Sequence, residues 1–230
     1  MTEWSTGVWN MPQSSTKICV LDDLLAPALV EQGYASLQLH KVPASTIYVP
    51  IRHIDSNEQL LAELGRWFAP SVTALLATYC RALMQKAVAF YDSQLDGYEI
   101  WTNCLTKCGP NVWVHLDNDE KHRRETGQVL TPLFGSVLHL GPIDGIEGGA
   151  TFFCLDNDQI KLEQIVFKHL PWDSLISLVA GSGVSVPFRG GRTILFDGKL
   201  AHCVSPFILD NERTPRLTLL VNGWSRPIKC

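Results

Sequence analysis

A single residue separates His115 from Asp117, and their types match two of the three ligands of a mononuclear iron centre. The run Val112–Asp117 predicts a strand, on which alternate side chains project from the same face. His115 and Asp117 would then lie side by side, with Leu116 on the other face. Two histidines and one carboxylate can hold Fe(II) on one side and leave positions open for O₂ and a co-substrate. The second histidine must come from another part of the chain.

Further motifs follow this pair in order along the chain. A Gly-Gly step opens one apolar run, and a Gly-Arg step opens a second. A histidine comes next, and an arginine then opens a long apolar run that ends near a tryptophan. These motifs are Gly148-Gly149-Ala150-Thr151-Phe152-Phe153, Gly191-Arg192-Thr193-Ile194-Leu195-Phe196-Asp197, His202, and Arg216 through Trp224.

The order of these motifs, over most of the chain, resembles the prolyl-4-hydroxylase-like branch of the Fe(II)/2-oxoglutarate-dependent dioxygenases. The segment Ile18–Leu25 also resembles the opening strand of that branch. The resemblance implies that His115, Asp117 and His202 bind Fe(II) and that 2-oxoglutarate and O₂ are co-substrates, with ascorbate a candidate reductant.

Arg216 is the residue that the resemblance assigns to the C5 carboxylate of 2-oxoglutarate. A planar guanidinium can hold a carboxylate through two parallel charge-assisted hydrogen bonds. Thr218 would share the face of Arg216 on a strand and could donate its hydroxyl to the same carboxylate. The basic residue of the family usually stands closer to the second histidine, so we interpret Leu209–Pro215 as a lengthened turn. The strand that begins at Arg216 favours Arg216 over Arg213.

Each of these residues also has a purely structural interpretation. His115 could be a core histidine bonded to backbone, and Asp117 could cap the turn that follows it. His202 could be a solvent-facing turn residue, and Arg216 a surface charge at the start of a strand. The resemblance favours the metal and co-substrate roles, and it leaves the turn role to Asp119.

The composition indicates a globular protein that does not depend on disulfide bonds for its stability. The chain has 230 residues, 46% hydrophobic and 18% charged, which predicts one large domain with a substantial core. A net charge of -4 provides no basic field for nucleic acid and no polybasic patch for a membrane surface. The N-terminus lacks the pattern of a signal peptide, and seven scattered cysteines favour reduced thiols, so we expect a cytoplasmic location.

The sequence pattern changes near residue 97, from mainly helical segments to short strands. We expect a single domain over 1–230, with a polar segment at 1–16, a supporting region at 17–96 and a β-rich catalytic core at 97–230. Predicted helices are Ala26–Leu37, Asn57–Trp67 and Ser71–Tyr91. Predicted strands are Ser45–Arg52, Tyr98–Thr106, Asn111–Asp117, Gly135–Leu140, Ala150–Phe153, Ile176–Leu178, Val184–Pro187, Thr193–Phe196 and Arg216–Gly223. Helices first and strands afterwards favour a mainly β fold with helices packed on one side, and the resemblance implies a double-stranded β-helix, the jelly-roll or cupin-like architecture.

These expectations define an oxygenase that oxidises an unactivated C–H bond of a small molecule or an amino-acid-derived substrate and releases succinate and CO₂. The carboxylate of Asp117 argues against the halogenating variants of this fold. Two alternatives remain open, namely a non-haem iron oxidase of the same fold that does not use 2-oxoglutarate and a non-catalytic β-barrel binding module. Trp101, Asn103 and Trp113 are candidates to face the site, and the charged run 118–130 is either a solvated loop or a substrate lid.

Overall fold

The computed structural model describes nine stretches of the chain, and the structural statements below concern these stretches. The predicted strand Ile176–Leu178 and the alternative residue Arg213 lie outside them. The described stretches are 7–10, 17–39, 46–54, 56–87, 94–106, 112–142, 144–155, 183–211 and 214–228.

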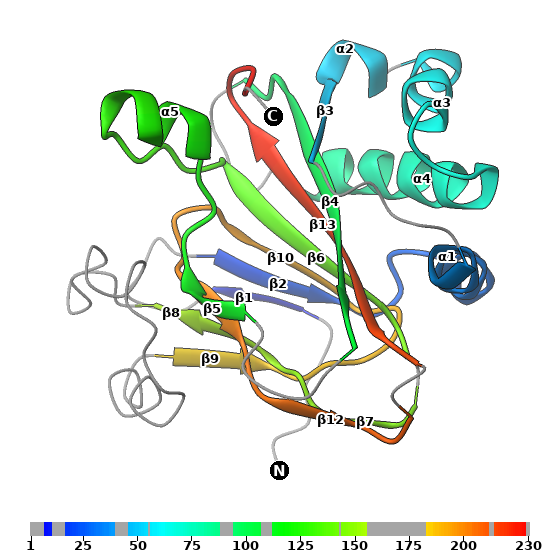
Figure 1. The fold of residues 1–230 in the computed structure, drawn as a ribbon. Helices are drawn as coiled ribbons and strands as arrows, with labels where there is room; N and C mark the ends of the chain where they lie inside the picture. Colours follow the sequence, from blue (N-terminus) through cyan, green and yellow to red (C-terminus); the bar gives the residue numbers. More distant parts are fainter. Residues whose placement is uncertain are drawn as a thin grey trace.

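A seven-stranded antiparallel sheet forms the centre of the fold (Figure 1). Its strand order β1-β2-β10-β6-β13-β4-β3 brings together segments from both ends of the chain. The two longest strands, β4 and β13, pair over their full length. The bounds are β1 Gly7–Asn10, β2 Lys17–Leu21, β3 Ile47–Pro50, β4 Gly97–Leu105, β6 Phe134–Gly141, β10 Thr193–Asp197 and β13 Arg216–Trp224.

Two smaller sheets complete the strand framework. A four-stranded sheet has the order β5-β11-β8-β9, and a two-stranded ribbon pairs β12 with β7. All of these pairings are antiparallel, as in a jelly roll. The bounds are β5 Val112–His115, β7 Ile146–Gly148, β8 Thr151–Cys154, β9 Gly183–Val186, β11 His202–Val204 and β12 Phe207–Leu209.

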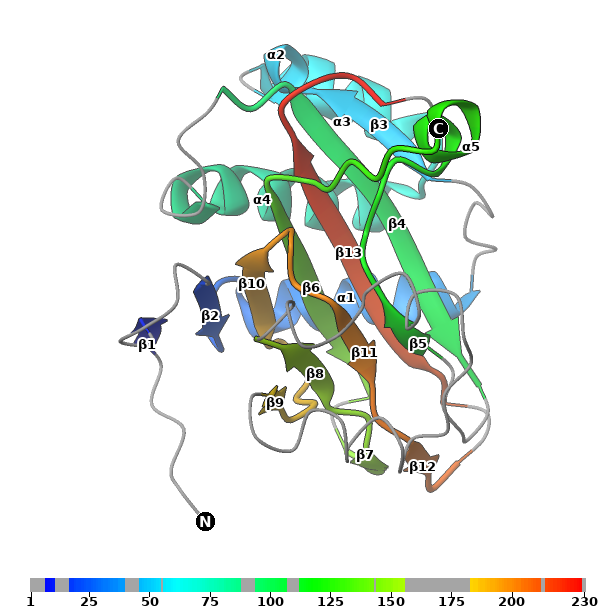
Figure 2. The same ribbon diagram turned by 90° about the vertical axis from the view of Figure 1, so that its left-hand side faces the viewer.

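Helices cover one face of the large sheet. Figures 1 and 2 show α1 and α4 lying across the back of β6, β13 and β4. They bury apolar residues such as Leu75, Leu76 and Leu83 against Leu138 and Leu219 of the sheet. Burying side chains of this size supplies most of the free energy that offsets chain entropy. The helices are α1 Pro27–Leu39, α2 Ile51–Ile54, α3 Asn57–Gly65, α4 Pro70–Ala87 and α5 Glu120–Thr126.

The four-stranded sheet packs against the opposite face of the large sheet. A second apolar cluster joins Ile194 and Phe196 of β10 to Phe153 of β8 and Val186 of β9. All eight residues of β6 are therefore buried, because helices cover one face of this strand and the second sheet covers the other. Two packed antiparallel sheets with helices on one side confirm the fold class that the sequence predicts.

Most predicted elements in the described stretches are present with ends shifted by one or two residues, but three expectations need correction. The predicted strand Asn111–Asp117 ends at His115, so Asp117 lies in the connection that follows it. The run 118–130 contains the helix α5 rather than an open loop. Of the predicted strand Ser45–Arg52, Ser45 lies outside the described residues, β3 covers Ile47–Pro50, and α2 begins at Ile51 instead of the strand continuing to Arg52. None of the described helices combines the length and the apolar character needed to span a bilayer.

Candidate metal centre

His115 and His202 face each other across two neighbouring strands. β5 pairs with β11 in an antiparallel arrangement, and the register places His202 directly opposite His115. Residues opposite each other in such a pair have Cβ atoms about 5 Å apart, which lets the two rings meet. The ring centroids are 4.4 Å apart. The pairing of strands thus joins two histidines that are far apart in the sequence.

Asp117 completes the cluster from the connection after β5. Its Oδ1 lies 3.5 Å from His115 Nε2, and its Oδ2 lies 3.8 Å from His202 Nε2. One ligand atom from each of the three residues falls within 4.8 Å of the other two. This spacing can accommodate a metal ion between two imidazole nitrogens and one carboxylate oxygen. The three residues predicted as ligands are therefore adjacent, although Asp117 is not placed by strand alternation.

A hydrogen bond and two aromatic contacts hold the ring of His202 in place. His202 Nδ1 lies 3.1 Å from the carbonyl oxygen of Leu200, which fits a neutral imidazole that donates from Nδ1 and leaves the lone pair of Nε2 available to a metal ion. The ring also packs against Phe196 and Phe153, with centroids 4.9 and 6.0 Å away. Only 5% of the side chain is exposed, so the interpretation of His202 as a solvent-facing residue is wrong.

Charges and burial set the protonation of this cluster. Burial alone would raise the pKa of Asp117. The neighbouring His202 and His115 and a hydrogen bond from Asn222 outweigh this effect and lower the pKa to about 2. Burial, together with the nearby His115, lowers the pKa of His202 to about 4. At neutral pH, Asp117 is therefore a carboxylate and His202 a neutral imidazole, and these are the forms that bind a metal.

Arg216 lies fully buried at the start of β13, not on the surface. Its side chain is 1% exposed, and its guanidinium carbon lies 5.0 Å from the ring centre of Phe188 and 5.8 Å from that of Phe207. Nη2 donates to the carbonyl oxygen of Gly149 at 3.2 Å, while Nε has no hydrogen-bond partner among the described residues. Burial lowers the pKa of Arg216 to about 10, which leaves it charged at neutral pH. A buried cation with an unsatisfied donor is suited to receiving an anion.

The Gly148-Gly149 step shapes the wall next to Arg216. Both glycines have positive φ angles, 83° and 70°, which side-chain-bearing residues rarely adopt. A Cβ on Gly149 would lie 3.2 Å from Arg216 Nε, and one on Gly148 would lie 2.3 Å from the carbonyl oxygen of Pro206. The motif is therefore needed for the close approach of the backbone to the guanidinium.

Thr218 lies two residues after Arg216 on the same face of β13, as predicted, and is 2% exposed. Its partner across the sheet is His139 of β6, a residue that the sequence does not single out. The His139 ring stacks on Phe188 at 4.5 Å, and its Nδ1 accepts a hydrogen bond from the backbone N–H of Arg189 at 3.3 Å. Burial and the nearby Arg216 hold the pKa of His139 well below its usual range. His139 is therefore a neutral imidazole near the charged Arg216.

The Gly-Arg motif at the start of β10 has a structural role. Arg192 Nε and Nη2 donate to the two carboxylate oxygens of Asp22 at 2.6 and 3.0 Å. The exposed Arg189 adds a hydrogen bond to the same carboxylate at 2.8 Å, and the hydrogen bond from Arg192 is the main cause of the lowered pKa of Asp22. This fork ties the segment that carries Phe188 to the end of β2.

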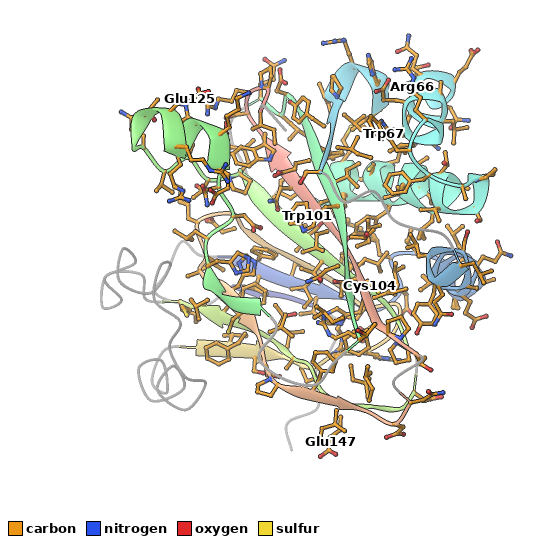
Figure 3. All side chains as sticks on the ribbon, in the orientation of Figure 1. Arg66, Trp67, Trp101, Cys104, Glu125 and Glu147 are labelled. Atoms are coloured by element: carbon orange, nitrogen blue, oxygen red, sulfur yellow. The ribbon has the colours of Figure 1, made fainter. Side chains whose placement is uncertain are left out.

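The remaining predicted positions fall near the face that carries Arg216. Trp101 and Asn103 of β4 lie opposite Leu220 and Thr218 of β13, and both are partly buried. Figure 3 shows Trp101 beside the middle of β13. Trp113 belongs to β5, but its side chain lies outside the described part of the structure.

Asp119 takes the turn role expected for it. Its carboxylate accepts a hydrogen bond from the backbone N–H of His122 at 2.9 Å and caps the first turn of α5.

Comparison with known proteins finds similarity at the level of structure alone. No protein-family model and no curated protein sequence matches the chain. A prolyl-4-hydroxylase from Pseudomonas putida matches with a TM-score of 0.52 at 13% identity, covering 92% of this chain and 87% of that one. AviO1 from Streptomyces viridochromogenes matches with a TM-score of 0.51 at 16% identity, covering 93% and 91%.

A third match is HygX from Streptomyces hygroscopicus, crystallised with nickel, 2-oxoglutarate and hygromycin B. Its TM-score is 0.51 at 14% identity, and the match covers 92% of this chain and 84% of that chain. Identities this low establish a common fold and leave the chemistry to be argued from the site. The chain has the fold of the prolyl-4-hydroxylase-like group of structures, as the order of its motifs predicts.

Proposed function

We propose that this protein is an Fe(II)- and 2-oxoglutarate-dependent oxygenase that oxidises a C–H bond of a small molecule. The reaction consumes one O₂ and one 2-oxoglutarate, and it gives succinate, CO₂ and, in the simplest case, an alcohol. The observation that carries the proposal is the adjacency of His115, Asp117 and His202, with their ligand atoms within 4.8 Å of one another. Two neutral donors and one anionic donor form the ligand set of a non-haem Fe(II) oxygenase.

The three side chains would hold the iron from one side. His202 presents Nε2 because its Nδ1 lies against the Leu200 carbonyl, and Asp117 stays ionised at neutral pH because its pKa is about 2. Iron held in this way supplies the activation of O₂, and the protein contributes position and shielding from water. The aromatic rings of Phe153 and Phe196 exclude water on the side of His202.

Arg216 would bind the distal carboxylate of 2-oxoglutarate, and Thr218 is the candidate second donor. Support comes from the unsatisfied Nε and from the absence of any carboxylate bonded to Arg216 among the described residues. A dicarboxylate that reaches from the iron to Arg216 would give the buried cation its counter-ion. Phe188, Phe207 and Gly149 would then enclose the ligand's far end.

The experiment that tests this proposal measures succinate formed from 2-oxoglutarate by the full chain under air with Fe(II). We expect slow succinate formation without an added substrate and no succinate when Fe(II) is replaced by Zn(II), which binds similar ligands but has no redox chemistry. Asp117→Ala should abolish succinate formation. If wild-type protein binds Fe(II) and yields no succinate with any substrate tested, the 2-oxoglutarate assignment is wrong.

A further inference from the structure

A pocket of about 470 Å³ opens beside the connection that follows β5, and its volume falls in the range of small-molecule sites. Asn118, which directly follows Asp117, lines this pocket together with Glu99 of β4 and residues at the start of α5. Asn222 connects the pocket to the metal centre, because its amide contacts the carboxylates of both Asp117 and Glu99. The wall of the pocket is therefore linked to Asp117 through a single side chain.

Glu99 is a mostly buried carboxylate in the pocket wall. Its Oε2 accepts hydrogen bonds from Trp224 Nε1 at 3.0 Å and from Asn222 Nδ2 at 3.4 Å. Both donors are neutral, and both bind the same oxygen. Among the described residues none donates a hydrogen bond to Oε1, so this oxygen can still accept one, and Glu99 belongs to the pocket wall.

The other acidic groups of the wall already have cations. Asp119 binds Arg226 Nη2 at 3.1 Å, and Glu120 binds Arg123 Nη2 at 2.6 Å and lies 3.7 Å from Arg124 Nε. Within the described stretches, Glu99 alone of these three carboxylates has no basic partner. Burial, helped by the nearby Asp117, raises the pKa of Glu99 to about 7, as expected for a carboxyl group without a compensating cation.

We propose that this pocket binds the substrate and that Glu99 receives a protonated amine of the substrate through Oε1. The inference rests on the proposed oxygenase function and adds to it the class of substrate, a small molecule with a primary or secondary ammonium group. A desolvated carboxylate is stabilised strongly when a cation donates to it, and an ammonium group brings both charge and hydrogen bonds.

The test compares the binding of 2-phenylethylamine and 2-phenylethanol, which have similar size and differ in charge. Ligand-observed NMR at pH 8 suits weak probes, and an alkylammonium resembles lysine, with a pKa of about 10.4, so it stays protonated. We expect the wild-type chain to bind the amine at least about tenfold more tightly than the alcohol, the range for one charge-assisted hydrogen bond. The Trp224 indole N–H resonance, identified with Trp224→Phe, should shift only on addition of the amine.

Two matched variants locate the effect. Glu99→Gln keeps an acceptor for Trp224 and Asn222 but removes the charge, so the preference for the amine should disappear. Lys121→Gln changes a charge in the wall of the same pocket and should retain that preference. Equal binding of both probes by wild-type protein overturns the proposal, as does a preference that survives in Glu99→Gln. These measurements need no turnover and can be repeated without iron, so failed succinate formation with intact amine binding would reject the oxygenase function alone.

Discussion

Replacement of Arg216 by alanine should remove the protein's ability to recognise the distal carboxylate of 2-oxoglutarate. In the structure, the guanidinium is 1% exposed, has one hydrogen bond to Gly149 and has an unsatisfied Nε. A bound carboxylate would gain charge-assisted hydrogen bonds in a site closed by Phe188 and Phe207. Losing them leaves the carboxylate unpaired in a dry pocket, which costs on the order of 2–4 kcal/mol, or about 30- to 1000-fold in affinity.

The assay should compare two oxo acids on each variant, because Arg216→Ala also opens a cavity and removes the partner of the Gly149 carbonyl. 2-Oxopentanoate has a methyl group where 2-oxoglutarate has its distal carboxylate. The ratio of the two affinities, measured by anaerobic calorimetry with Fe(II), cancels any general loss of folded protein. We expect wild-type protein to favour 2-oxoglutarate by the factor above and Arg216→Ala to bind both oxo acids about equally.

Two further substitutions refine this prediction. Arg216→Lys should recover part of the preference, since the charge remains but the fork and the stacking on the aromatic rings are lost. Arg213→Ala should have little effect, because Arg213 belongs to the turn before β13 in the sequence interpretation. An Arg216→Ala protein that keeps its preference for 2-oxoglutarate would refute the assignment, and a crippling effect of Arg213→Ala would show that the turn is placed wrongly.

Three other predictions concern the metal, the pH dependence of stability and the thiols. His115→Ala, Asp117→Ala and His202→Ala should each weaken Co(II) binding by tenfold or more, judged by absorption spectroscopy, as the loss of one of three ligands predicts, whereas His122→Ala should bind normally. In metal-free protein the pKa of Glu99 rises from 4.5 to about 7 on folding. The free energy of unfolding of the wild type, measured in urea, should therefore fall relative to that of Glu99→Gln as the pH rises from 4.5 to 7, by on the order of 2 kcal/mol. A difference that stays constant with pH would contradict the argument that this carboxyl group is buried. Thiol titration of denatured, unreduced protein prepared under reducing conditions should count all seven cysteines, and a lower count would argue against a cytoplasmic location.

The order of the motifs predicts that His115, Asp117 and His202 lie close together, but not the path by which Asp117 reaches the two histidines. The spacing of His115 and Asp117 suggested alternation along one strand, yet β5 ends at His115 and Asp117 approaches from the connection to α5. The backbone leaves the sheet because Asp119 caps a helix and Arg226 holds the same carboxylate from the end of the chain. The identity of the residues was sufficient for the prediction, whereas their geometry depends on a partner more than a hundred positions away.

The sequence contains boundary residues for the helix α5, but its charged composition favours a loop. Asp119 at its N-cap and Gly127 with a φ of 74° at its C-terminus are ordinary helix-boundary residues. The seven residues between them bury no side chain, so the segment has no apolar periodicity and its charges suggest a solvated loop. A helix of this length is stabilised by its caps and by the pairing of Glu120 with Arg123, and neither contributes to a hydrophobic pattern.

The residues that the sequence could not reveal are those whose role depends on register between distant strands. Glu99 meets Asn222, and His139 meets Thr218, only because β4 and β6 pair with β13 in one specific alignment. A slip of one residue would turn each of these side chains to the helix-covered face. Turning Glu99 and Arg216 toward that apolar core would remove the hydrogen bonds that Glu99 accepts from Trp224 and Asn222 and the one that Arg216 donates to Gly149, a cost of several kcal/mol for each charged group. The polar positions on these strands therefore help to select the alignment that also forms the site.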